Sequence, residues 1–121
     1  MTMYEVEIRI GANANKYWGK MQFEAKNKIH KKEIEGERSA SKQSNALEAL
    51  ICCLKAINNP CMLSIYSTED YIISAFQQGW LQNWQKNNWK NSQGNTVRNA
   101  EQWEELWELL KPHSRRVMKG E

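Results

Sequence analysis

The spacing of the apolar residues changes period along the chain, and this change constrains the fold more than any other feature. In YEVEIRI every second residue from Tyr4 to Ile10 is apolar, which is the pattern of a strand with one buried face. From Asn45 onward, apolar residues recur at the three- and four-residue spacing of a helix. The sequence therefore predicts a sheet with helices packed against it.

The same two periods locate the remaining elements. Alternation predicts a strand at 20–25, and 31–37 is expected to be a weaker, polar strand at a sheet edge. A short apolar strand is expected at 61–67, and a last strand at 114–118. The lysine-rich segment 26–32 is expected to be a hairpin connection or a protected sheet edge. Helices are expected to begin at Asn45 and Asn99 as N-caps, and a third helical run passes through Ile72 and Phe76. Three successive strands favour an antiparallel meander, and the later strand–helix–strand order implies a parallel crossover within one domain, 1–121.

Composition excludes several classes of protein. No apolar run approaches the roughly 18 residues of a membrane span, and the N-terminus lacks the pattern of a secretory leader. Cys52, Cys53 and Cys61 form neither an even disulfide framework nor a CxxC pair, which indicates reduced core thiols. We therefore expect a cytoplasmic protein with no membrane partner. His30 and His113 lie in basic surroundings and are expected to be solvated.

Positive charge is segregated within the segment 80–99, which contains Lys86, Lys90 and Arg98 but no acidic residue. Such a surface suits the phosphate backbone of a nucleic acid, although solvated faces also segregate charge. The same segment carries three tryptophans, of which Trp80 and Trp84 are spaced to share one helical face and to pack as scaffold. The third, Trp89, either packs beneath the basic side chains or lies against a sugar.

Several strings resemble bacterial ribonuclease HI. STEDY is similar to the family's S-T-D-x-x-Y region, and SNALEAL is similar to its N-x-x-E helix start. WLQNWQKNNWK resembles the helix and loop that the family uses as a basic handle, and NTVRNAEQWEEL resembles the segment that leads into the next helix. The resemblance covers the chain from Tyr4 to Glu121 and is strongest from Asn45 to Leu110.

This resemblance implies an α/β fold with a mixed five-stranded sheet, three antiparallel strands joined by two parallel ones, and with the family's final helix missing from the sequence. It also implies binding of an RNA–DNA hybrid and two-metal hydrolysis of the RNA strand by four carboxylates, Asp-Glu-Asp-Asp, assisted by a histidine. The residues in the positions of nucleic-acid contacts are Asn45, Trp80, Trp84, Lys86, Trp89, Lys90 and Arg98.

The active-site positions depart from the family pattern. Gly11 takes the place of the first aspartate, Glu48 matches the glutamate, and Glu69 replaces the second aspartate. Glu121 falls where the histidine would be, and the sequence has no counterpart of the last aspartate; its one aspartate is Asp70. We therefore expect impaired catalysis, with Glu48 and Glu69 as remnant catalytic and metal positions. Mg²⁺ or Mn²⁺ is implied only if the chain is active.

Three hypotheses about function stay open at this point. The first is a catalytically impaired domain that binds an RNA–DNA hybrid or a duplex through the handle. The second is an active, divergent ribonuclease H that cleaves the RNA strand with Glu48, Glu69 and a ligand from a partner chain. The third is a protein-interaction module. A sheet face without its covering helix is expected to be apolar, and would then be buried in a homodimer or by another protein.

Overall fold

The computed structural model describes residues 4–120, in which five strands and four helices follow one another. In chain order these are β1 (Tyr4–Ala12), β2 (Lys16–Ala25), β3 (Lys28–Glu37), α1 (Lys42–Lys55), β4 (Cys61–Ser67), α2 (Asp70–Gln77), α3 (Trp80–Lys86), α4 (Ala100–Leu110) and β5 (Ser114–Lys119). None of the helices in this described part combines the length and apolarity that crossing a bilayer requires.

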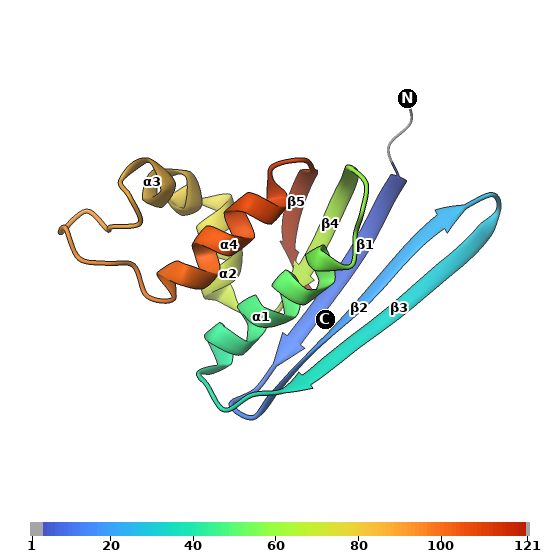
Figure 1. Cartoon of the computed structure of the whole chain (residues 1–121), viewed down its shortest axis with the longest axis horizontal. Helices are drawn as coiled ribbons and strands as arrows, with labels where there is room; N and C mark the ends of the chain where they lie inside the picture. Colours follow the sequence, from blue (N-terminus) through green and yellow to red (C-terminus); the bar gives the residue numbers. More distant parts are fainter. Residues whose placement is uncertain (1–3, 121) are drawn as a thin grey trace.

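The strands form one mixed sheet in the order β3-β2-β1-β4-β5 (Figure 1). The hairpin strands β2 and β3 pair antiparallel, as do β1 and β2, whereas β4 pairs parallel with both β1 and β5. Three antiparallel strands thus continue into two parallel ones. This arrangement confirms the predicted sheet.

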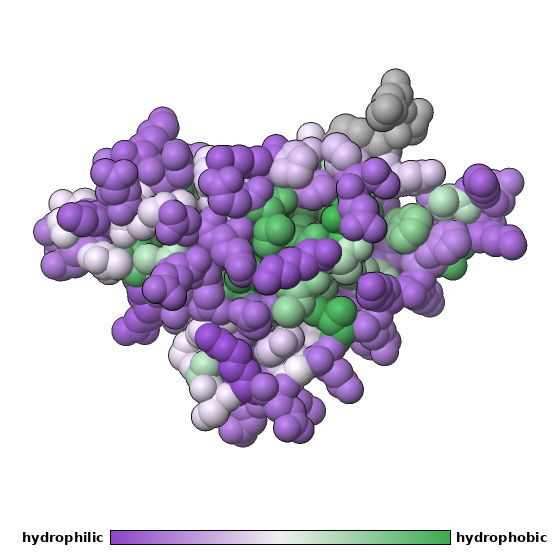
Figure 2. Space-filling model, in the orientation of Figure 1, coloured by the Kyte–Doolittle hydropathy of each residue, from purple (hydrophilic) through white to green (hydrophobic). Residues whose placement is uncertain are grey.

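The core lies between the sheet and the helices. Packing of α1 against β1 and β2, and of α4 against α1, buries the apolar side of each element (Figure 1). Ile8, Leu50 and Trp103 are among the side chains with no exposed surface. Each such side chain contributes about 1.5–3 kcal/mol relative to an exposed one. On the face seen in Figure 2, hydrophilic side chains cover most of the surface, and apolar ones are visible in the middle.

The opposite face of the sheet carries charged pairs together with exposed apolar side chains, among them Trp18, Ile29 and Met62. At the alternate positions of β1, Arg9 Nη2 lies 2.7 Å from Glu7 Oε1, and the Arg9 guanidinium stacks 4.2 Å from the centre of the Tyr66 ring. On the hairpin, Lys20 Nζ lies 4.0 Å from Glu33 Oε1. Dimerisation through this face would have to remove these charged side chains from water.

One helix boundary differs from expectation, and one open alternative is decided in favour of a sheet edge. The N-cap of α1 is Ser41, whose Oγ accepts a hydrogen bond from the Ser44 amide at 3.0 Å, so Asn45 lies inside the helix. The hairpin turn consists only of Lys26 and Asn27, both in the left-handed region with φ of 54° and 64°. Two such residues match the twist of the paired strands, so most of the lysine-rich segment belongs to β3.

His113 is buried, contrary to the expectation that it is solvated. Its Nδ1 accepts a hydrogen bond from the Cys61 backbone N–H at 2.9 Å and so joins the start of β5 to the start of β4. Burial lowers the pKa of His113 from its ordinary value. His30 is exposed and stacks on Phe23, with ring centres 4.9 Å apart. All three cysteines are free thiols.

Candidate nucleic-acid interface and remnant active site

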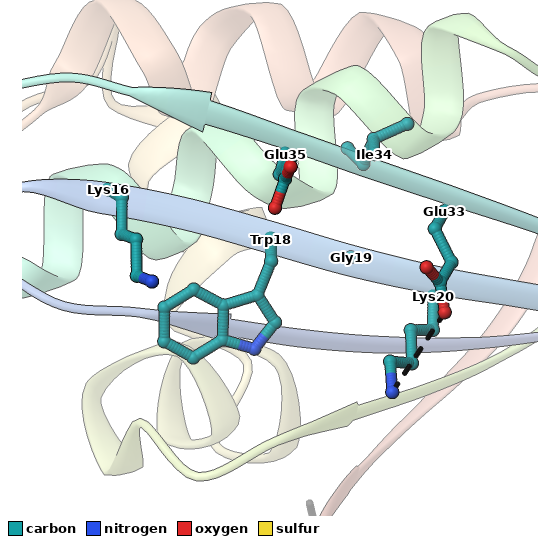
Figure 3. Close-up of a pocket in the computed structure, with 7 residues that line it drawn as sticks. All are labelled: Lys16, Trp18, Gly19, Lys20, Glu33, Ile34 and Glu35. Atoms are coloured by element: carbon teal, nitrogen blue, oxygen red, sulfur yellow. Dashed lines mark ion pairs between the residues drawn. The ribbon is translucent and has the colours of Figure 1, made fainter.

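Gly11 lies in β1 directly opposite Trp18 of β2. A Cβ atom at position 11 would lie 2.5 Å from Cε2 of Trp18, a separation that real Cβ contacts do not show. The indole therefore fills the space that any side chain at position 11 would need. Figure 3 shows that Lys16, Trp18 and Lys20 point to the same side of β2, and that Ile34 points to the other. With 37% of its surface exposed, Trp18 makes this position an aromatic surface instead of a carboxylate.

Glu48 is held by a network between two helices. Gln102 of α4 donates from Nε2 to Glu48 Oε2 at 3.2 Å and to the Ser44 carbonyl at 2.9 Å. Its Oε1 accepts a hydrogen bond from Ser44 Oγ at 2.7 Å. On the other side, Cys52 Sγ lies 4.0 Å from Glu48 Oε1. The carboxylate is thus part of the packing between α1 and α4.

Glu69 follows β4 and occupies the N-cap position of α2 without making a side-chain cap hydrogen bond. Its side chain is only 16% exposed, and Lys42 Nζ lies 3.6 Å from Oε1. The neighbouring Asp70 is exposed and pairs with Lys119 at 3.3 Å. The Lys42 ammonium group therefore lies beside the Glu69 carboxylate, where a metal cation bound by that carboxylate would otherwise lie.

The donor set does not fit the pair of divalent ions that the fold family implies. A magnesium pair needs several oxygen ligands in near-octahedral geometry. Among residues 4–120, no three His, Cys, Asp or Glu side chains lie close enough to hold one ion. Gly11 offers no ligand, and Glu48 and Glu69 are engaged by an amide and an ammonium group. Glu121, in the position of the family's histidine, lies outside the described residues.

The handle consists of α3 and the loop 87–99, and an aromatic cluster anchors it. The ring of Trp84 lies 5.5 Å from that of the buried Trp103, and 6.2 Å from the rings of both Tyr71 and Trp80. Trp84 therefore packs as scaffold. Trp80 lies at the outer edge of the cluster, with 39% of its surface exposed.

The loop after α3 has a fixed backbone. Trp89 adopts a left-handed conformation with φ of 64°, which costs a bulky residue roughly 1–2 kcal/mol. Two hydrogen bonds hold it there: its N–H donates to the Trp84 carbonyl at 2.6 Å, and its carbonyl accepts from the Val97 N–H at 3.0 Å. Its half-buried side chain packs against the core. Farther along, Asn91 Oδ1 accepts from the Gln93 and Asn95 amides at 3.0 and 3.1 Å.

The handle presents three basic side chains to solvent, one from α3 and two from the loop. Lys86, Lys90 and Arg98 are all exposed. Within residues 4–120, none of the three takes part in an ion pair. Unneutralised cations on a rigid backbone are suited to an extended anion.

Asn45 is buried instead of exposed for contact with a nucleic acid. It is 0% exposed, and its Nδ2 donates to the carbonyls of Asn13 and Arg38, both at 2.8 Å. Its Oδ1 accepts from Arg38 Nη1 at 3.0 Å. The amide joins the β1–β2 connection to the segment before α1, and this geometry leaves it no donor for a ligand.

Sequence reasoning missed the side chains that surround the remnant carboxylate positions, chiefly Trp18, Gln102 and Lys42. Gly11 and Trp18 lie on the same face of the sheet, but this follows from the alternation of side chains only when the hairpin register is known. Similarly, Gln102 reaches Glu48 through the contact between α4 and α1, although the two residues lie far apart in the sequence.

A model of the RNase H family matches residues 10–119, nearly the whole described chain. The chain belongs to the RNase H family. A ribonuclease H from Thermoanaerobacter sp. (strain X514) is 45% identical over 53 residues, which cover 43% of this chain and 34% of that protein. The aligned segment thus spans about a third of that curated relative.

Solved RNase H structures have the same fold. LC9-RNase H1, a type 1 RNase H with the type 2 active-site motif, superimposes with a TM-score of 0.83 at 13% identity, covering 99% of this chain and 64% of that one. A foamy viral protease-reverse transcriptase in complex with an RNA/DNA hybrid gives 0.67 at 12% identity, covering 96% and 17%. These likenesses confirm the fold that the sequence resemblance implied.

Proposed function

We propose that this RNase H-family domain binds an RNA–DNA hybrid or a duplex through its handle and does not cleave it by the family's two-metal mechanism. One observation carries the proposal: an ordered handle with unpaired cations accompanies a remnant site in which Trp18 covers Gly11. Binding and cleavage are thus separated within one fold.

The handle supports the binding half of the proposal. Lys86, Lys90 and Arg98 project from a backbone that the Trp84 and Trp89 contacts hold in place, so little ordering entropy is lost when a phosphate backbone docks. Each phosphate that is neutralised releases a counterion, which favours binding at low salt. The foamy viral structure with a bound hybrid belongs to the same fold class and favours the same ligand class.

The remnant site supports the loss of cleavage. Metal-assisted hydrolysis needs carboxylates positioned to within a fraction of an ångström, and a misplacement of about 1 Å costs on the order of 100-fold in rate. Here the first position has no ligand and is covered by an indole, while Glu69 is neutralised by Lys42. The second position, Glu48, is fixed by Gln102.

A salt titration of binding tests the handle. We expect fluorescence anisotropy with a labelled hybrid to show tight binding at low salt. The triple variant Lys86→Gln, Lys90→Gln, Arg98→Gln should weaken binding, and the slope of log K against log salt should fall by about 2–3.

The matched control removes three charges from the far hairpin, at Lys28, Lys31 and Lys32, each replaced by Gln. These lysines are exposed on β3, away from the handle, and the control variant should bind as the parent does. Equal losses in the two triple variants would show that binding follows net charge alone and would contradict the handle.

A further inference from the structure

A second basic surface lies at the other edge of the sheet from the hairpin. A pocket of about 520 Å³ opens between α2, α3 and β5, and the residues that line it include Arg115 and Arg116. No carboxylate is among its lining residues in the described part of the chain. Its charge is therefore positive without local compensation.

Arg115 differs from Arg116 in this pocket because it is partly buried against aromatic rings. It is half-buried, and its guanidinium lies 5.7 Å from the centre of the Trp107 ring and 6.0 Å from that of Phe76. Among residues 4–120 it takes part in no ion pair. A guanidinium that is partly removed from water without an anionic partner carries a desolvation cost, which a bound anion would offset.

Other donors line the same pocket, one from β5, one from the residue just before β5 and one from α3. Arg116 is exposed and donates from Nε to Ser64 Oγ at 3.2 Å. His113 accepts at Nδ1 from the Cys61 N–H, so the neutral ring carries its proton on Nε2. From α3, Gln82 adds an exposed amide.

We propose that this pocket binds a phosphate group, with Arg115 as the principal contact. The planar guanidinium offers paired N–H donors that match two phosphate oxygens, and the two aromatic rings hold it in a defined orientation. The pocket lies by the start of β5, whereas Glu69 follows the end of the parallel strand β4, so the two sites are at opposite ends of these strands. This proposal does not depend on the handle binding nucleic acid.

Two sources could supply the phosphate: the backbone of a nucleic acid that continues past the handle, or a free or terminal phosphate group. The pocket touches the handle helix through Gln82, which makes a continuous track feasible. Both sources present the same chemistry to Arg115, and the arms of the experiment separate them.

The first arm is isothermal titration of the intact chain with inorganic phosphate. We expect saturable one-to-one binding in the millimolar range, weakened at least 10-fold in Arg115→Met, which retains the apolar contact with Phe76 and Trp107. Arg115→Lys keeps the charge and should retain part of the affinity, which separates binding from folding. Lys111→Gln, whose parent side chain pairs with Glu108 on the surface, should bind phosphate as the parent does. Circular dichroism checks that each variant is folded.

The second arm repeats the hybrid titration with Arg115→Met. A lower affinity and a salt slope reduced by about one would identify a backbone phosphate as the occupant. Unchanged hybrid binding together with lost phosphate binding would identify a free or terminal phosphate. The absence of saturable phosphate binding to the parent, or equal binding by Arg115→Met, would overturn the proposal while leaving the handle untouched.

Discussion

At the scale of single residues, Gly11 and Trp18 form a cross-strand pair in which the aromatic ring lies over the glycine. Such a pair shields a strand glycine that has no side chain of its own to pack. It also means that restoring an acidic residue at position 11 requires the indole to move. The glycine and the ring that lies over it therefore form one structural unit.

A double-mutant cycle tests this pair. Gly11→Ala should destabilise the protein by about 1 kcal/mol, because the added Cβ displaces the indole from a packed position. In a Trp18→Ala background the same substitution should be neutral or stabilising, since the obstruction is gone and alanine costs less backbone entropy than glycine. Urea unfolding measures both values. Additive effects would show that the two residues do not compete for space.

His113 predicts a pH dependence of stability. Its pKa is lowered in the folded protein by burial, so the folded state favours the neutral ring and the unfolded state binds more protons at acid pH. The stabilisation is complete above the ordinary value of 6.5 and is lost as pH falls below it through the folded pKa. Thermal unfolding between pH 7.5 and about 5 should show a falling Tm.

His113→Asn is the control for this pH dependence, because its amide oxygen can accept the Cys61 hydrogen bond without titrating. The variant should have a shallower Tm profile than the parent across this interval. Identical slopes for the two proteins would assign the dependence to other groups.

At the scale of elements, the sequence predicted strands and helices well wherever one face is buried, because the apolar residues then recur at a regular spacing. β4 was predicted with its observed limits, since CMLSIYS alternates and Pro60 precedes it. The lysine-rich segment 26–32 stayed open between a connection and a protected edge, and the structure places most of it in the edge strand β3, which tolerates charge on both faces. Ser41 was missed as N-cap because its hydrogen bond lies before the apolar pattern begins.

The resemblance suggested candidate site positions but not the side chains around them. Gly11, Glu48 and Glu69 were located by resemblance to short family strings. Their partners Trp18, Gln102 and Lys42 depend on strand register and helix packing, which no local pattern specifies. The burial of Asn45 has the same cause, since its acceptors lie in two separate connections.

The free energy of unfolding should depend on Trp84 of the handle far more than on Trp80. Trp84→Ala removes a half-buried ring from contact with Trp103 and Tyr71, and we expect a loss of about 2–3 kcal/mol in the free energy of unfolding. Trp80→Ala, at the exposed edge of the cluster, should cost about 1 kcal/mol or less. Urea unfolding followed by circular dichroism compares the two. A larger loss for Trp80 would contradict the proposed role of Trp84 as scaffold.

At the scale of the whole molecule, the open sheet face determines the expected assembly. The pairs Glu7–Arg9 and Lys20–Glu33 place charges across it, and dimerisation would have to desolvate them. We therefore expect a monomer at micromolar concentration in analytical sedimentation. A mass that rises with concentration would revive the hypothesis of a homodimer.

In the proposed function the domain binds a nucleic acid without cleaving it, and one assay measures both binding and cleavage. A labelled RNA–DNA hybrid is titrated with the protein in Mg²⁺ and, separately, in Mn²⁺, and the same samples are read by anisotropy and by denaturing gel. We predict a saturable, salt-dependent rise in anisotropy with an intact RNA strand. Cleavage that Glu48→Gln abolishes would demonstrate an active, divergent ribonuclease H and contradict the account, as would the absence of binding at low salt.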